Sequence, residues 1–172
     1  GHEVILATRD KDVTLQLLDD YNYLYEIMSK KGAGLVGLSL ELLTHAKKLH
    51  RLARDFKADV IVEIGGTFIV HVCKLLGIKG VVFTDTEHAK LSNAITFPFA
   101  TKICTPSSYK DDLGKKQVRY NGYQELAYLH PNYFKPDPES LVASGLREDE
   151  KFYIDRCVSC AASHDVGKLG LS

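Results

Sequence analysis

The sequence lacks several features that would assign it to a special class of protein. Its formal net charge is +0 over 172 residues, so no overall field favours nucleic acid or an anionic membrane as partner. No apolar run approaches the ~20 residues that a membrane span needs, and no signal peptide is visible. The turn at residues 65–67, between a strand and a helix, carries neither GxGxxG nor GxxxxGK[ST], so neither a dinucleotide site nor a P-loop is indicated there. We therefore expect a cytoplasmic protein without a cofactor, with peripheral membrane contact at most.

Cysteine is also scarce. Four cysteines in a chain of this length do not make a disulfide scaffold. Cys157 and Cys160 form a lone CxxC, and a structural zinc site would need four ligands, of which His164 could be only the third. A thioredoxin-like pair begins a helix after a strand, whereas this pair lies in or just after an expected strand. The sequence therefore predicts two buried cysteines and no metal site.

Hydrophobic residues make up 45% of the chain and charged residues 26%, the balance of a globular domain. Strand and helix patterns alternate, and the strands are continuous apolar runs, which predicts a doubly wound, mostly parallel, Rossmann-like α/β sheet. The patterns predict strands at 2–8, 23–28, 59–64, 80–84, 102–105 and 152–158. They predict helices at 12–21 after an Asp cap, 38–56, 67–76 ending at Gly77, 90–97, 107–113 and 138–144, with a loop at 30–37.

The domain organisation follows from composition. Residues 129–149 are richer in Pro, Asp and Glu and are typical of a connection between lobes. We expect residues 1–150 to form one Rossmann-like lobe with this connection, and residues 151–172 to start a second lobe. The chain begins with Gly1 and enters a strand at once. We therefore expect a piece of a longer protein.

The first candidate site follows the expected strand 80–84, where Asp85, Glu87 and His88 stand within four positions. In an open α/β sheet, ligands bind beyond the carboxyl ends of the strands. A carboxylate beside another has a raised pKa, which suits a general base. The sequence thus predicts a catalytic acid/base cluster of Asp85, Glu87 and His88. The alternative is a polar strand end that caps the next helix.

A second candidate is the turn Gly65-Gly66-Thr67, between a strand and a helix. Glycines there allow close backbone approach, and the helix N-terminus offers N–H groups to an anion or a sugar hydroxyl. The alternative is a tight turn with no ligand. If the turn binds, Asn93 is a further binding candidate.

Two blocks of sequence carry a resemblance. One comprises TDTEHA at 84–89, Asn93, FPFA at 97–100 and CTPS at 104–107; the other is KKQVRYNGYQELAYLHP at 115–131. Nearly the whole chain resembles an archaeal and bacterial family of unknown function described as glycosyltransferase-like. That family is similar to UDP-N-acetylglucosamine 2-epimerases and to GT-B glycosyltransferases such as the lipid-II-forming enzyme. The resemblance implies two Rossmann-like lobes, with the acceptor in the N-terminal lobe and the nucleotide-sugar in the C-terminal lobe. It also implies that this chain lacks the first strand and helix of its N-terminal lobe.

The resemblance also implies roles for individual residues. The His-Val-Glu-Ala-Gly run of the epimerases matches residues 85–89 and places Glu87 on their catalytic Glu. Their Gly-Asp-Thr turn matches residues 65–67, where the carboxylate is missing. Their Thr-x-His-Arg-Arg-Glu-Asn segment matches residues 163–167, which keep His164 as a binding residue and lose the arginines. These departures favour glycosyl transfer over epimerisation.

The resemblance therefore implies part of a sugar-nucleotide-dependent glycosyltransferase of polysaccharide or glycolipid biosynthesis. Its partners would be a nucleotide-sugar and a sugar or lipid-linked acceptor. One alternative is a UDP-N-acetylglucosamine 2-epimerase-like enzyme. Another is a non-catalytic lobe that binds a nucleotide or sugar. The expected binding residues are Gly65, Gly66, Thr67, Asn93 and His164.

Overall fold

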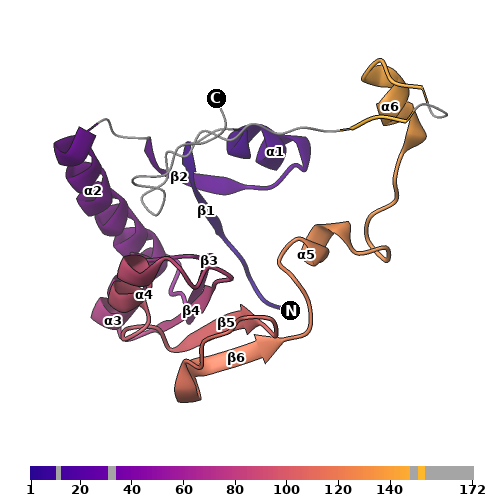
Figure 1. Cartoon of the computed structure of the whole chain (residues 1–172). Helices are drawn as coiled ribbons and strands as arrows, with labels where there is room; N and C mark the ends of the chain where they lie inside the picture. Colours follow the sequence, from indigo (N-terminus) through magenta and orange to yellow (C-terminus); the bar gives the residue numbers. More distant parts are fainter. Residues whose placement is uncertain (11–12, 31–33, 148–150, 154–172) are drawn as a thin grey trace. The chain divides into compact units, whose positions relative to one another are not determined.

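The computed structural model describes residues 1–10, 13–30, 34–147 and 151–153 (Figure 1). The chain divides into two compact units, residues 1–120 and 121–172. The strands of the first unit are β1 (Leu6–Asp10), β2 (Tyr25–Lys30), β3 (Val60–Ile64), β4 (Lys79–Phe83), β5 (Lys102–Pro106) and β6 (Gln117–Tyr120). Its helices are α1 (Thr14–Asp20), α2 (Gly34–Asp55), α3 (Ile69–Leu76), α4 (Lys90–Thr96) and the 3₁₀ turn η1 (Gly114–Lys116). The second unit contains α5 (Leu126–Leu129) and α6 (Pro138–Ala143).

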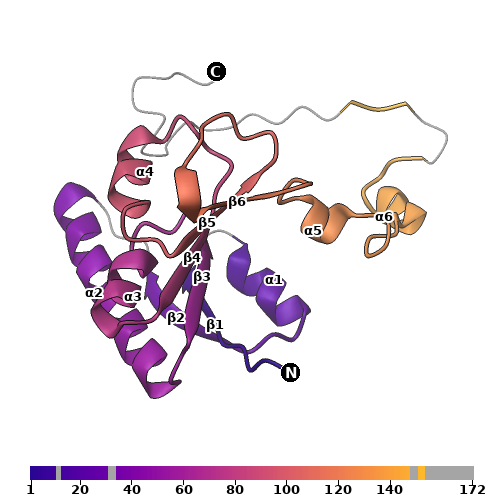
Figure 2. The same ribbon diagram turned by 90° about the horizontal axis from the view of Figure 1, so that it is seen from below.

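All the strand pairs are parallel. β1 and β2 form one sheet, and β3, β4, β5 and β6 form a second sheet in that order. Parallel strands joined in consecutive order by right-handed crossovers carry their helices on one face. Figure 2 shows α2, α3 and α4 on one side of the strands and α1 on the other. The predicted doubly wound, Rossmann-like α/β fold is confirmed.

The core lies where α2 and α3 pack on the strands. Leu49 and Ala53 stand four positions apart, on one face of α2, and both are buried. Met28 of β2 belongs to the same buried cluster as Val82 of β4 and Ile103 of β5. The two sheets of the first unit therefore share one hydrophobic core, to which α2 contributes Leu49.

Strand β3 differs from the predicted fully buried strand. Ile61 and Glu63 are half-buried, whereas Val60, Val62 and Ile64 are 45%, 56% and 67% exposed. Successive side chains of a strand point to opposite faces. Ile61 packs against the core cluster that holds α3 residues, so only this face of the edge strand is covered by the first unit's core.

Several predicted boundaries are wrong. Residues 107–113 form no helix; backbone carbonyls of this connection instead accept hydrogen bonds from the side chain of Arg119 in β6. The predicted loop 30–37 is too long, since α2 already begins at Gly34. The N-cap of α1 is Val13, which makes no side-chain hydrogen bond, rather than the predicted Asp. Strand β1 begins at Leu6 rather than at residue 2.

Other local expectations are confirmed. Gly77 ends α3 with φ of 72°, a left-handed conformation that glycine adopts without steric cost. In the second unit, Pro138 begins α6, and Asp137 caps it by accepting the backbone N–H of Glu139 at 3.0 Å.

The end of the chain is described only in part. Residues 152 and 153 belong to no strand, and the rest of the predicted strand 152–158 lies outside the described residues, as do Cys157, Cys160 and His164. Within the described part of the chain, no helix combines the length and the apolar character needed to cross a bilayer.

Candidate functional site in a groove beside Glu87

The segment 84–89 joins the carboxyl end of β4 to α4. The backbone N–H of Thr84 donates to the carbonyl of Cys104 at 3.0 Å, which continues the pairing with β5. The side-chain amide of Asn93 donates to the carbonyl of Thr86 at 3.0 Å. One predicted binding residue thus fixes the loop that carries the predicted catalytic residues.

Glu87 is held by a connection that lies far from it in the sequence. Its Oε1 accepts the backbone N–H of Lys110 at 3.0 Å. This hydrogen bond favours the charged form and lowers the pKa of Glu87, and the charges of Lys110 and His88 act in the same direction. The predicted raised pKa is therefore wrong: the N–H donor outweighs any effect of a neighbouring carboxylate. Glu87 is an ionised carboxylate at neutral pH.

Asp85 and His88 are both exposed. Oδ1 of Asp85 accepts the hydroxyl of Thr86 at 2.9 Å, and Asp85 is not among the charges that shift the pKa of Glu87. His88 lowers that pKa through its charge. The structure thus pairs Glu87 with Lys110 and His88 rather than with a second carboxylate.

A groove of about 440 Å³ lies between α4 and the β5–β6 connection. Its lining consists of one face of α4 at helical spacing, the connection, and the loop before α4: Lys90, Asn93, Ala94, Phe97, Pro98, Tyr109, Asp111, Leu113 and Glu87. Two predicted site residues, Glu87 and Asn93, therefore line one cavity. No local sequence pattern indicates Lys90, Tyr109 or Asp111 as site residues. Tyr109 and Asp111 lie more than 20 positions from Glu87 in the sequence, and only the tertiary fold brings them to the groove.

Tyr109 is the buried member of this lining, with 3% of its surface exposed. Among the described residues, none makes a hydrogen bond with its hydroxyl. Burial raises the pKa of Tyr109, and the charges of Asp111 and Glu87 raise it further, so the phenol keeps its proton. A buried donor without a hydrogen-bond partner lowers the stability of the fold by about 1–3 kcal/mol. A ligand oxygen that accepted a hydrogen bond from this hydroxyl would remove that cost, which would favour binding of the ligand.

The glycine turn after β3 adjoins α4 but does not line the groove. Gly65 has φ of 66° and donates its N–H to the carbonyl of Phe83 at 2.8 Å. The hydroxyls of Thr67 and Ser92 lie 2.9 Å apart, which links the turn to α4. Gly66 is buried against Glu63. These contacts show why glycines occur here. The chain makes a tight turn after β3, and the turn is hydrogen-bonded to the end of β4 and lies close to α4.

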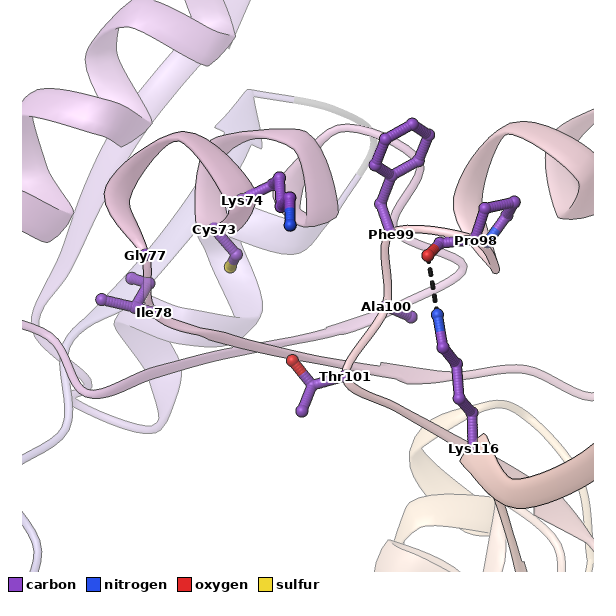
Figure 3. Close-up of a pocket in the computed structure, with 9 residues that line it drawn as sticks. All are labelled: Cys73, Lys74, Gly77, Ile78, Pro98, Phe99, Ala100, Thr101 and Lys116. Carbon is purple, nitrogen blue, oxygen red and sulfur yellow. Dashed lines mark hydrogen bonds between the residues drawn. The ribbon is translucent and has the colours of Figure 1, made fainter.

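A second cavity, of about 350 Å³, lies at the other end of the sheet (Figure 3). Gly77 and Ile78 precede β4 and Thr101 precedes β5, so this cavity lies at the amino ends of the strands. No predicted site residue lines it. Ligands of open α/β sheets bind beyond the carboxyl ends, where Glu87 follows β4, so the groove beside Glu87 is the candidate site.

Comparison with known proteins assigns this sequence to a family. The model of the family described as "Protein of unknown function (DUF354)" matches residues 1–168. The chain belongs to the DUF354 family. Among curated proteins, none matches it. The described residues of this DUF354 protein hold no group of three or more His, Cys, Asp and Glu side chains that could bind a metal ion.

A crystal structure of MurG from Acinetobacter baumannii is similar in fold to this DUF354 protein. The TM-score is 0.55 at 18% sequence identity, over 66% of this chain. The match spans 35% of the MurG chain. The similarity shows that this chain shares the fold of part of the MurG chain.

Proposed function

We propose that this chain is the acceptor-binding lobe of a GT-B-like glycosyltransferase. The donor would be a nucleotide-sugar and the acceptor a sugar or a lipid-linked sugar. One observation carries the proposal: an ionised carboxylate, Glu87, lines a groove beyond the carboxyl end of β4 in a lobe of this type. Glu87 is also the residue that the resemblance to the epimerases marks as catalytic.

In this reaction an acceptor hydroxyl would lie in the groove next to Glu87. Its oxygen would bond to the anomeric carbon of the donor as the bond from that carbon to the diphosphate breaks. The nucleoside diphosphate would leave with the electron pair, and Oε2 of Glu87 would take the proton. Because the Lys110 N–H on Oε1 keeps the pKa of Glu87 low, the proton would move late, when the forming bond has made the hydroxyl acidic.

The lining supports an acceptor with both polar and apolar parts. Ala94, Phe97, Pro98 and Leu113 provide apolar surface, while Lys90 offers a cation on the same face of α4. Ligand sites commonly combine an apolar lining with a few polar groups that orient the ligand. A glycolipid-type acceptor with an anionic group fits this combination.

The test is nucleotide release by the full-length protein, with UDP-, GDP-, ADP- and dTDP-sugars paired with sugar and lipid-linked acceptors. We expect Glu87→Gln to lower kcat by about 10²–10⁴-fold, the usual contribution of a general base. Glu26→Gln, which neutralises an exposed carboxylate on β2, is the matched control and should leave kcat unchanged.

Three results would contradict the proposal. Absence of donor binding and of nucleotide release over the whole panel would remove the glycosyltransferase. Full activity of Glu87→Gln would remove Glu87 as the base and favour a binding lobe. Solvent deuterium at C2 of the donor sugar, without transfer, would identify an epimerase instead.

A further inference from the structure

The segment 115–120 is part of the second sequence block that carries the family resemblance. Its side chains have a structural role that the sequence alone does not reveal. Lys116 stands just before β6, and its ammonium donates to the carbonyl of Pro98 at 2.6 Å (Figure 3). It also donates to the carbonyl of Phe97 at 3.2 Å. Both carbonyls directly follow the end of α4, where Phe97 and Pro98 line the groove. Lys116 therefore anchors one wall of the candidate site.

Arg119 anchors the opposite wall. Its guanidinium donates from Nη1 to the carbonyls of Tyr109 and, at 3.4 Å, Ser107, and from Nη2 to the carbonyl of Asp111 at 2.8 Å. Tyr109 and Asp111 flank Lys110, whose N–H donates to Glu87. A planar guanidinium with five fixed donors can hold several carbonyls in one geometry, which a lysine ammonium does not reproduce.

Gln117 secures the same connection to the core. Its Nε2 donates to the hydroxyl of Thr105 at 2.9 Å and to the carbonyl of Asp111 at 3.2 Å. Its Oε1 accepts the N–H of Leu113 at 3.0 Å. Thr105 is fully buried, so the connection is tied to the interior of the sheet.

We propose that Lys116, Gln117 and Arg119 form an anchoring triad that positions both walls of the groove, and that Arg119 sets the position of the Glu87 carboxylate through Lys110. Arg119 is thus a positioning residue, which acts through the Tyr109 and Asp111 carbonyls and the N–H between them. The inference rests on the proposed function only in treating Glu87 as the base. The placement of Glu87 is measurable without turnover.

Arg119→Lys tests the triad because it keeps the charge and removes the planar fork. The groups that act on Glu87 in the described residues are the N–H and ammonium of Lys110 and the imidazole of His88, and Glu87 in turn acts on Tyr109. Lys90 and Asp111 line the same groove. Arg119→Lys retains all of these groups. A change in the pKa of Glu87 in this variant is therefore due to loss of the planar guanidinium.

Two measurements on the full chain are decisive. A ¹³C NMR titration follows the Glu87 carboxyl, assigned as the signal that Glu87→Gln removes, and hydrogen exchange follows the Lys110 amide. In Arg119→Lys we expect the pKa of Glu87 to rise toward its ordinary value of 4.5. We also expect the Lys110 amide to exchange about tenfold faster, as loss of a supporting hydrogen bond predicts. Arg54→Lys is the matched control, because Arg54 pairs with Asp55 on the exposed side of α2.

Unchanged titration and unchanged Lys110 exchange in Arg119→Lys would overturn the inference. Should that variant not fold, Gln117→Glu serves instead: it loses the donors to Thr105 and Asp111 and keeps the acceptor for Leu113. Faster Lys110 exchange there supports the triad, and unchanged exchange refutes it. If no donor–acceptor pair is turned over, the proposed function fails while these NMR results still decide the anchoring role. With turnover, Arg119→Lys should lower kcat more than it changes KM.

Discussion

Glu63 lies directly against Gly66. A Cβ atom built on Gly66 would stand 2.2 Å from Oε2 of Glu63 and 2.8 Å from its Cβ. Gly66 is therefore a glycine because the side chain of the strand residue three positions earlier occupies the space where its own side chain would be. Close approach of a ligand is not needed to explain it.

This contact predicts that Gly66→Ala lowers the free energy of unfolding by about 1–3 kcal/mol, the usual cost of overpacking. Gly65 provides the contrast, because nothing lies within 4 Å of a Cβ there and only its φ of +66° is demanding. Asn tolerates that conformation, so Gly65→Asn should be milder than Gly66→Asn. Urea unfolding of these three variants and the wild type measures the difference. Equal losses at both positions would contradict the steric account.

The same carboxyl predicts a pH dependence of stability. Burial raises the pKa of Glu63, and the charge of Arg9 opposes this. A carboxyl whose pKa is higher in the folded chain stabilises the fold below the unfolded value, 4.5, and this contribution is lost as the pH rises through the folded pKa. Glu63→Gln should therefore raise Tm at pH 7, and the gain should shrink as the pH falls toward 4.5.

Thermal unfolding of Glu63→Gln and the wild type across this pH range provides the measurement. Glu26→Gln neutralises an exposed strand carboxylate and should show no such convergence. A gain for Glu63→Gln that is constant from pH 4 to pH 7 would mean that burial of the charge is not its cause.

Tyr109→Phe removes the buried hydroxyl that has no hydrogen-bond partner among the described residues. We expect this variant to raise the free energy of unfolding by about 1 kcal/mol, because an unsatisfied buried group is lost. Tyr25→Phe is the matched control, since the Tyr25 hydroxyl donates to Asp19 at 2.9 Å, and it should be slightly destabilising. Destabilisation by Tyr109→Phe in urea unfolding would show that the hydroxyl has a partner in solution.

The hydroxyls of Thr67 and Ser92, 2.9 Å apart, predict coupling between the glycine turn and α4. Thr67→Val and Ser92→Ala should each lower the free energy of unfolding by about 1 kcal/mol. The double variant should lose less than the sum, with a coupling of about 0.5–1.5 kcal/mol. Thr44→Val on the exposed side of α2 is the control. Additive losses in the double-mutant cycle would exclude the hydrogen bond.

The sequence by itself determined what depends on neighbours along the chain. Apolar runs between turn residues predict β4 and β5, helical spacing predicts the buried face of α2, and Gly77 predicts the end of α3. The position of Glu87 at the carboxyl end of a strand follows from the same local pattern. These features are predictable because hydrophobic periodicity and backbone conformation are properties of short segments.

Only the tertiary structure decided the environment of Glu87. The sign of its pKa shift comes from the N–H of Lys110, 23 positions away, and the groove needs Tyr109 and Asp111 beside α4. The connection 107–113 was predicted to be a helix, yet Arg119 and Gln117 bind its carbonyls from β6. Hydrogen bonds between segments distant in sequence form only once strand pairing sets the register, so no local pattern contains them.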